Sequence, residues 1–150
     1  MKKIILAALV FMGSLQLQAQ TGNTEALNSI GALSAFTIYD VYCFVGSLAD
    51  GYSSKVYDGA YIKQLVDEQL KMLSNAQSTM QSLGSSGYIT DEADKDFLSD
   101  INSCFELLIR EGNALNAFVD SGSQADADAF QAARNAAWEK IAALLGIKNE

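Results

Sequence analysis

Histidine and proline are both absent from this 150-residue sequence. Without histidine, the chain cannot form a His-based catalytic triad, use the commonest general base, ligate haem through an imidazole or build most zinc sites. Without proline, nothing in the sequence forces a long helix to kink or stop. These two absences argue against the commonest kinds of enzyme, and we expect a protein without catalytic residues, without a metal and without a cofactor.

Cysteine is scarce, since the chain holds only Cys43 and Cys104. In an oxidising compartment the two could form a disulfide. The other interpretation is a pair of thiols that pack as small apolar residues. The helices predicted below would separate them by about 9 Å of axial rise, whereas a disulfide needs Cα atoms within about 7 Å. The spacing slightly disfavours the bond, but a small shift in helix boundaries would permit it.

Only one long apolar run is present, and it lies at the start of the chain. Residues 4–12 are uninterrupted apolar residues that follow Lys2 and Lys3, and Leu17 and Ala19 then stand at the −3 and −1 positions of a cleavage site. This order is typical of a secretory signal peptide, and the run is shorter than the roughly 20 residues of a membrane span. An uncleaved N-terminal anchor is the alternative interpretation.

We therefore expect a signal peptide over residues 1–19, cleaved near Ala19, and a single domain over residues 20–150. The signal has a bacterial layout, so the predicted location is the periplasm or the medium. No later apolar stretch of spanning length follows, and we expect no membrane insertion of the mature chain.

Negative charge exceeds positive charge. Cleavage would remove Lys2 and Lys3 from the 10 basic residues, leaving 8 against 18 acidic residues and a net charge of −10. Such a chain repels nucleic acid and anionic lipid. It suits a basic protein partner or cations.

Apolar residues recur at spacings of three and four in four segments, which Gly/Ser clusters separate. The predicted helices cover residues 24–50, 58–83, 91–120 and 124–145. Their similar lengths and short turns predict an all-α, up-down-up-down antiparallel four-helix bundle.

Helix-capping residues support these boundaries. Thr90 and Ser123 precede the third and fourth helices and are typical N-terminal caps. Gly84, Gly122 and Gly146 stand where a helix commonly ends in a left-handed residue.

Polar residues interrupt the apolar stripes at two levels. Counting from the turns places Asp40 level with Gln69, and Glu111 level with Arg134. One interpretation is a polar site inside the bundle. The interpretation that we favour is a pair of contacts that select one arrangement of the helices.

Aromatic residues gather near one predicted end of the bundle. They could form a surface for a partner, because tyrosine combines apolar area with a hydroxyl group. Ordinary packing of the bundle end is the alternative. The residues are Tyr39, Tyr42, Tyr52, Tyr57, Tyr61, Phe118 and Phe130.

Two acidic stretches, residues 91–100 and 120–128, lack the glycine and glutamate positions of a calcium-binding loop. Acidic residues in a first helical turn are favoured by the helix dipole, so neither stretch predicts a metal site.

The function that these features favour is a non-catalytic interaction protein of the bacterial envelope, of the inhibitor, immunity or secretion-accessory type, with an unknown protein partner. A periplasmic carrier of a small ligand or cation, using the polar layer, is the first alternative. An enzyme that uses only carboxylates is the second, and the least favoured.

Overall fold

The computed structural model describes the backbone of residues 2–147 and the side chains of residues 25–147. Every regular element in that range is an α-helix. The four helices are α1 (Lys2–Ser53), α2 (Gly59–Ser85), α3 (Glu92–Ser121) and α4 (Gln124–Leu145).

Helix α1 begins much earlier than the sequence predicted. It runs unbroken from Lys2, because no proline interrupts it and single glycines such as Gly13 and Gly22 cost only about 1 kcal/mol each in a helix. The chain divides into two units, Met1–Ser34 and Ala35–Glu150. The first holds only the N-terminal part of α1. The side chains of residues 1–19 lie outside the described residues, so the signal peptide stays a prediction.

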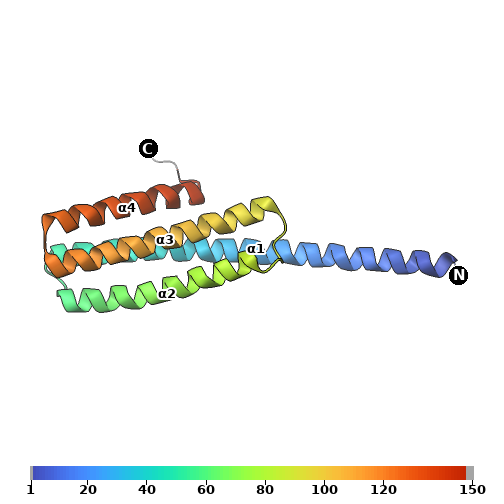
Figure 1. Cartoon of the computed structure of the whole chain (residues 1–150), viewed down its shortest axis with the longest axis horizontal. Helices are drawn as coiled ribbons and strands as arrows, with labels where there is room; N and C mark the ends of the chain where they lie inside the picture. Colours follow the sequence, from blue (N-terminus) through green and yellow to red (C-terminus); the bar gives the residue numbers. More distant parts are fainter. Residues whose placement is uncertain (1, 148–150) are drawn as a thin grey trace. The chain divides into compact units, whose positions relative to one another are not determined.

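The second unit is a bundle in which successive helices run in opposite directions (Figure 1). Between α2 and α3, Lys63 pairs with Asp120 and Asn116 donates a hydrogen bond to Asp67, so the residue numbers rise on one helix as they fall on the other. The four helices pack against each other, and the prediction of an all-α helical bundle is confirmed.

One apolar stripe from each helix forms the core, as the spacing predicted. On α1 the stripe contains Ile38, Val41 and Val45, which follow one another at spacings of three and four residues. The fully buried members on the other helices include Ile62, Val66, Leu73, Leu98, Ile101, Phe105, Leu108, Leu115, Ala137 and Ile141. Gly112 brings α2 close to α3, since a Cβ there would lie 2.9 Å from a methyl carbon of Leu70.

Side chains cap three helix starts. Asp58 caps α2, and Asp91, rather than the predicted Thr90, caps α3 by accepting hydrogen bonds from two backbone N–H groups. A carboxylate one residue later is therefore the cap, which also complements the helix dipole. Ser123 caps α4 as predicted and bonds reciprocally with Asp126.

The helix ends follow the glycine pattern in part. Gly122 and Gly146 are left-handed caps, as predicted. Gly84 is not a cap, because α2 continues to Ser85 and the left-handed residue of that connection is Gly87.

The part of α1 from Glu25 to Ser53 is long and apolar enough to cross a membrane, with a mean hydropathy of 1.4 over an 18-residue window, so the expectation that no stretch of spanning length follows residue 20 is corrected. A helix that contributes a core stripe to a bundle has the same composition, so this property alone does not indicate a membrane protein.

Candidate functional site

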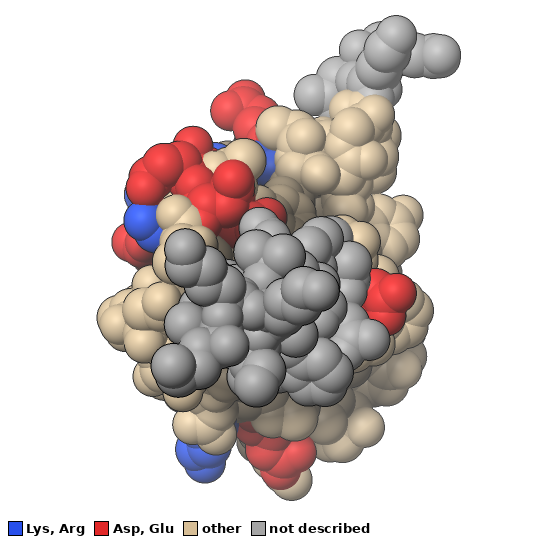
Figure 2. Space-filling view, turned by 90° about the vertical axis from the view of Figure 1, so that its right-hand side faces the viewer, with Lys and Arg blue, Asp and Glu red and all other residues tan. Residues whose placement is uncertain are grey.

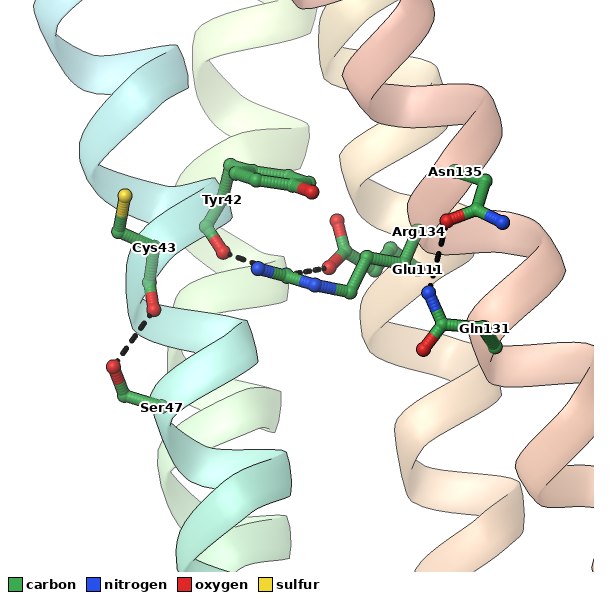
Figure 3. Close-up of polar contacts among 7 residues, drawn as sticks. All are labelled: Tyr42, Cys43, Ser47, Glu111, Gln131, Arg134 and Asn135. Carbon is green, nitrogen blue, oxygen red and sulfur yellow. Dashed lines mark hydrogen bonds and ion pairs between the residues drawn. The ribbon is translucent and has the colours of Figure 1, made fainter.

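A charged pair lies inside the bundle at the level that the sequence predicted. Glu111 of α3 is fully buried, and Arg134 Nη1 of α4 lies 2.6 Å from its Oε1. The same Nη1 donates a 2.9 Å hydrogen bond to the backbone carbonyl oxygen of Tyr42 on α1. Figure 3 shows the guanidinium group reaching from α4 between the carboxylate and this carbonyl. One arginine thus connects three helices.

Gly46 makes room for this arginine. A Cβ at Gly46 would lie 2.6 Å from Cζ and 2.7 Å from Nη1 of Arg134, closer than real Cβ atoms approach other atoms. The guanidinium group therefore occupies the space that a side chain would fill on α1.

An aromatic ring also packs on the guanidinium group. Arg134 Cζ lies 3.9 Å from the centroid of the Tyr42 ring, which is a cation–π contact. The Tyr42 ring also stacks on Trp138, with 5.4 Å between ring centroids. We call Tyr42, Gly46, Glu111 and Arg134 the buried polar cluster.

Burial dominates the electrostatics of this cluster. It raises the pKa of Glu111 to about 7, against the opposing effect of the Arg134 contact. The second carboxylate oxygen of Glu111, Oε2, is buried and has no hydrogen-bond partner among the described residues. Burial also raises the pKa of the Tyr42 hydroxyl, while Arg134 lowers it.

The other predicted pair does not form a core layer. Asp40 is exposed on α1, and Gln69 is only half-buried on α2. The reason is geometric: the buried stripe of α1 passes through Ile38 and Val41, so Asp40 lies about 100° away from Val41 around the helix. The expectation of a four-residue polar layer is corrected to the pair Glu111 and Arg134.

The seven aromatic residues do not form one surface. Tyr52, Phe118 and Phe130 pack inside the bundle end: the Tyr52 and Phe118 rings meet edge to face, and Phe130 is buried. The Tyr52 hydroxyl donates to the backbone carbonyl of Val119 at 3.2 Å. These three residues hold the end of the bundle together, with Phe130 buried and Tyr52 and Phe118 half-buried, and their contribution to a partner surface stays a prediction.

Tyr39 and Tyr42 also lie apart from the turn between α1 and α2. Tyr42 belongs to the buried polar cluster. Tyr39 is partly exposed, as is Phe36 one turn before it.

Tyr57 and Tyr61 are exposed next to each other, with ring centroids 5.6 Å apart. Val56 lies beside Tyr57 in the chain and is 68% exposed, although the sequence pattern did not place it in the predicted partner surface. We call Val56, Tyr57 and Tyr61 the turn patch.

The end of α1 explains why Val56 is exposed. The backbone N–H groups of Lys55 and Val56 donate to the carbonyls of Tyr52 and Gly51, which is the Schellman pattern of a helix C-terminus. In this pattern the second residue after the helix commonly makes an apolar contact with a side chain in the last turn. Here these two positions are Val56 and Gly51. Gly51 has no side chain for that contact, and a Cβ there would lie 2.7 Å from Cε2 of Tyr57.

The same turn holds a left-handed residue that is not glycine. Lys55 has a φ of 58°, which is the conformation that favours glycine at this position. Strain of this kind often occurs at functional sites.

Acidic residues outnumber basic ones at the end of the bundle that carries the turn patch. The connection between α3 and α4 lies at the same end of the bundle as the turn between α1 and α2 (Figure 1). Hydrogen bonds from Ser121 and Ser123 lower the pKa of Asp126, so its carboxylate stays ionised. The acidic residues of this end are Asp50, Asp58, Asp120, Asp126 and Asp128, against Lys55 and Lys63.

The two cysteines are free thiols. Cys43 is exposed on α1, whereas Cys104 is buried on α3, and burial raises the pKa of Cys104 to about 11. The structure therefore does not form the disulfide that the sequence left open.

Residues 25–147 contain no group of three or more Cys, Asp or Glu side chains that could hold a metal ion. Comparison with protein families, curated proteins and solved structures finds no significant match to this chain. Its function therefore has to be argued from its own residues, since a bundle architecture hosts many functions.

Proposed function

We propose that the protein is an exported, non-catalytic interaction protein that binds a basic protein partner through the turn patch. The observation that carries this proposal is the exposure of three neighbouring large side chains, Val56, Tyr57 and Tyr61. Tyrosine is among the residues that most often provide the binding energy at protein interfaces.

The surrounding charge supports a basic partner. Five carboxylates and two lysines lie at this end of the bundle, and one of the lysines, Lys63, is 2.5 Å from Asp120 and so already paired. Negative potential attracts a partner with exposed lysine or arginine and repels acidic ones. An arginine of the partner could also stack on the exposed tyrosine rings.

The buried polar cluster is a weaker candidate for a carrier or enzyme site. Glu111 and Arg134 contact each other, and the guanidinium group fills the space beside Gly46. Glu111 Oε1, the guanidinium group of Arg134 and the carbonyl of Tyr42 thus satisfy one another, while Glu111 Oε2 is left without a hydrogen-bond partner among the described residues. This favours an interaction protein over the alternatives of a cation carrier and a carboxylate enzyme.

Export is part of the proposal, and the support for it is the order of charged, apolar and small residues at the start of the chain. The partner would then meet the protein in the periplasm or outside the cell. Inhibitor, immunity and secretion-accessory proteins share this description.

Site-specific photo-cross-linking tests the proposal. Benzoylphenylalanine placed at Tyr61 should capture one protein with a basic surface from the native envelope, and salt should weaken the capture because surface charges are screened. The matched control is the same residue at Met72, which is 57% exposed on the same helix but about 16 Å away.

The purified captured protein should then bind the wild-type chain directly. Equal capture from positions 61 and 72, or a captured protein that binds Tyr57→Ser/Tyr61→Ser as tightly as wild type, would refute the assignment of this surface.

A further inference from the structure

The outer face of α1 carries large apolar side chains that the bundle does not cover. Phe36 is 71% exposed, and Tyr39, about one turn further along, is 46% exposed. Asp40, Cys43 and Ser47 are exposed as well. Figure 3 shows Cys43 and Ser47 on the side of α1 that points away from the carboxylate and guanidinium groups of the core. We call these five residues the outer stripe of α1.

The outer stripe has the spacing of a surface that packs against another helix. Phe36, Asp40, Cys43 and Ser47 follow one another at intervals of four, three and four residues. Alternating intervals of this kind are typical of the contact line between two packed helices. The core contacts of this chain lie on the opposite side of α1, through Ile38, Val41 and Val45. A helix of another molecule would therefore be needed to cover the outer stripe.

Charge narrows the choice of that helix. Asp40 is the only charged residue between positions 26 and 49. The 18 acidic residues of the chain lie mostly beyond α1, and Figure 2 shows acidic side chains gathered on one side of the bundle end that it views. No lysine or arginine occurs between Lys3 and Lys55, so this face has no basic group for anionic lipid headgroups. It fits a nearly neutral surface that supplies a hydrogen-bond donor for Asp40.

A second copy of this chain has such a surface. When two α1 helices pack in parallel about a twofold axis, equivalent residues on the contact line face each other, so Phe36 meets Phe36 and Cys43 meets Cys43. Asp40 and Tyr39 lie on opposite flanks of that line, about 100° apart around the helix. The Tyr39 hydroxyl of one copy thus lies beside the Asp40 carboxylate of the other, to which it can donate a hydrogen bond.

An antiparallel pair would lack this match. In that arrangement each flank meets the same flank of the second copy, so Asp40 would lie beside Asp40 and the two carboxylates would repel each other. The exposed residues of the outer stripe are therefore complementary to themselves in the parallel orientation.

We propose that two copies of this protein associate in parallel through the outer stripe of α1. Two acidic chains thereby meet at a face that carries one charge in each copy. A contact between two helices buries less surface than a standard interface of about 1,600 Å², so we expect a dissociation constant on the order of 10–100 µM. The turn patch is a different surface, so either proposal can fail without the other.

Sedimentation velocity of the purified, reduced protein from about 1 to 300 µM tests the association. Wild type should show a monomer–dimer equilibrium. Phe36→Glu should weaken it at least about tenfold, because two carboxylates replace the contact between the rings. Tyr88→Glu is the matched control, since Tyr88 is 78% exposed in the connection between α2 and α3, and it should dimerise like wild type. Wild type that stays monomeric at about 300 µM, or Phe36→Glu that associates as tightly as wild type, would overturn the proposal.

Cys43 reports whether the helices are in register. One molecule of glutathione disulfide oxidises two Cys43 thiols to an interchain disulfide and leaves two molecules of reduced glutathione. At about 100 µM protein, wild type should form this covalent dimer at least about tenfold more than Cys43→Ser/Tyr88→Cys. The thiol of that control variant is exposed but lies off the outer stripe, so it should end as a monomer with glutathione attached. Equal cross-linking of the two proteins would contradict the parallel arrangement.

Asp40→Asn separates the two orientations. In a parallel dimer the substitution should weaken association at least about threefold, because the Tyr39 hydroxyl loses a charged acceptor. In an antiparallel dimer it would remove the repulsion between two carboxylates and strengthen association. Sedimentation velocity of Asp40→Asn beside wild type measures the direction of the change. Tighter association of the variant would overturn the parallel arrangement.

Discussion

The buried polar cluster and the turn patch both depart from the usual distribution of polar and apolar side chains, in opposite directions. In the cluster, a carboxylate and a guanidinium group lie inside the bundle. In the turn patch, a valine and two tyrosines face solvent. Most of the cluster is compensated within the chain, because Arg134 contacts Glu111, the carbonyl of Tyr42 and the Tyr42 ring; Glu111 Oε2 is the oxygen that stays without a partner among the described residues.

The turn patch is covered less completely, because the Tyr57 ring lies over Gly51 while Val56 stays 68% exposed. Its helix end has a glycine where an apolar side chain would cover Val56, and a lysine where glycine is favoured. Buried charged groups that bond to each other within the chain are best explained by a role in holding the fold together. Apolar and aromatic side chains that the chain leaves exposed are best explained by a binding partner that covers them.

The largest effect should come from removing the positive charge of the cluster. Arg134→Met would leave Glu111 buried without its partner, and the free energy of unfolding should fall by about 3–5 kcal/mol. The double variant Glu111→Leu/Arg134→Met should recover most of this loss, because no buried charge remains. Chemical denaturation of both variants measures this. If the double variant lost as much unfolding free energy as the single variant, the lost contact between Glu111 and Arg134 would account for the effect, and the unpaired buried charge would not.

A somewhat smaller loss should follow when the space for the arginine is filled. Gly46→Ala would displace the guanidinium group from Glu111, and the better helix propensity of alanine offsets part of that cost. A net loss of about 2 kcal/mol is expected. Gly84→Ala is the control, since open space surrounds that position and the same exchange should stabilise α2 by about 0.5–1 kcal/mol. If both substitutions stabilised the protein equally, the contact between Arg134 and Glu111 would not depend on the space that Gly46 leaves.

The cluster should also make stability depend on pH. The pKa of Glu111 is about 7 in the folded protein and near its ordinary 4.5 when unfolded. Between these values the folded state keeps a proton that the unfolded state releases, so this residue's contribution to stability falls as the pH rises. The full fall would be about 3–4 kcal/mol.

Glu111→Gln should abolish this part of the pH dependence. The difference in unfolding free energy between wild type and Glu111→Gln should therefore change between pH 4.5 and about pH 8, in favour of the variant at the higher pH. A difference that stays constant across this range would mean that Glu111 is ionised throughout.

The smallest effect concerns the turn. Lys55→Gly should relieve the left-handed strain and raise the free energy of unfolding by about 0.5–1 kcal/mol, after the greater chain entropy of glycine is subtracted. Thermal unfolding of this variant measures the gain. A loss of stability would show that the lysine side chain makes a contact that outweighs the strain.

The sequence predicted the regular parts of this molecule well. Apolar spacing and Gly/Ser turns located the last three helices, and counting residues from the turns placed Glu111 level with Arg134. The same counting failed for Asp40, because a level along the axis does not specify the direction around it. One residue turns a side chain by about 100°.

Features that depend on backbone geometry could not be predicted in this way. Val56 is exposed because of the bonds that end α1 and because residue 51 is glycine, which spacing rules do not represent. Gly46 carries a usable signal in the sequence, because an isolated glycine inside a helical pattern often has a packing reason. The space that it leaves for Arg134 is that reason.

The most direct test of the account is to combine stability and binding for Tyr57→Ser/Tyr61→Ser. We predict that this double variant melts within about 2 °C of wild type, since exposed side chains contribute little to folding. We also predict that it binds the partner captured at position 61 at least about thirtyfold more weakly. A variant that loses several kcal/mol of stability, or that keeps wild-type affinity, would show that the exposed tyrosines serve the fold or nothing at all, and would contradict the distinction between the two regions.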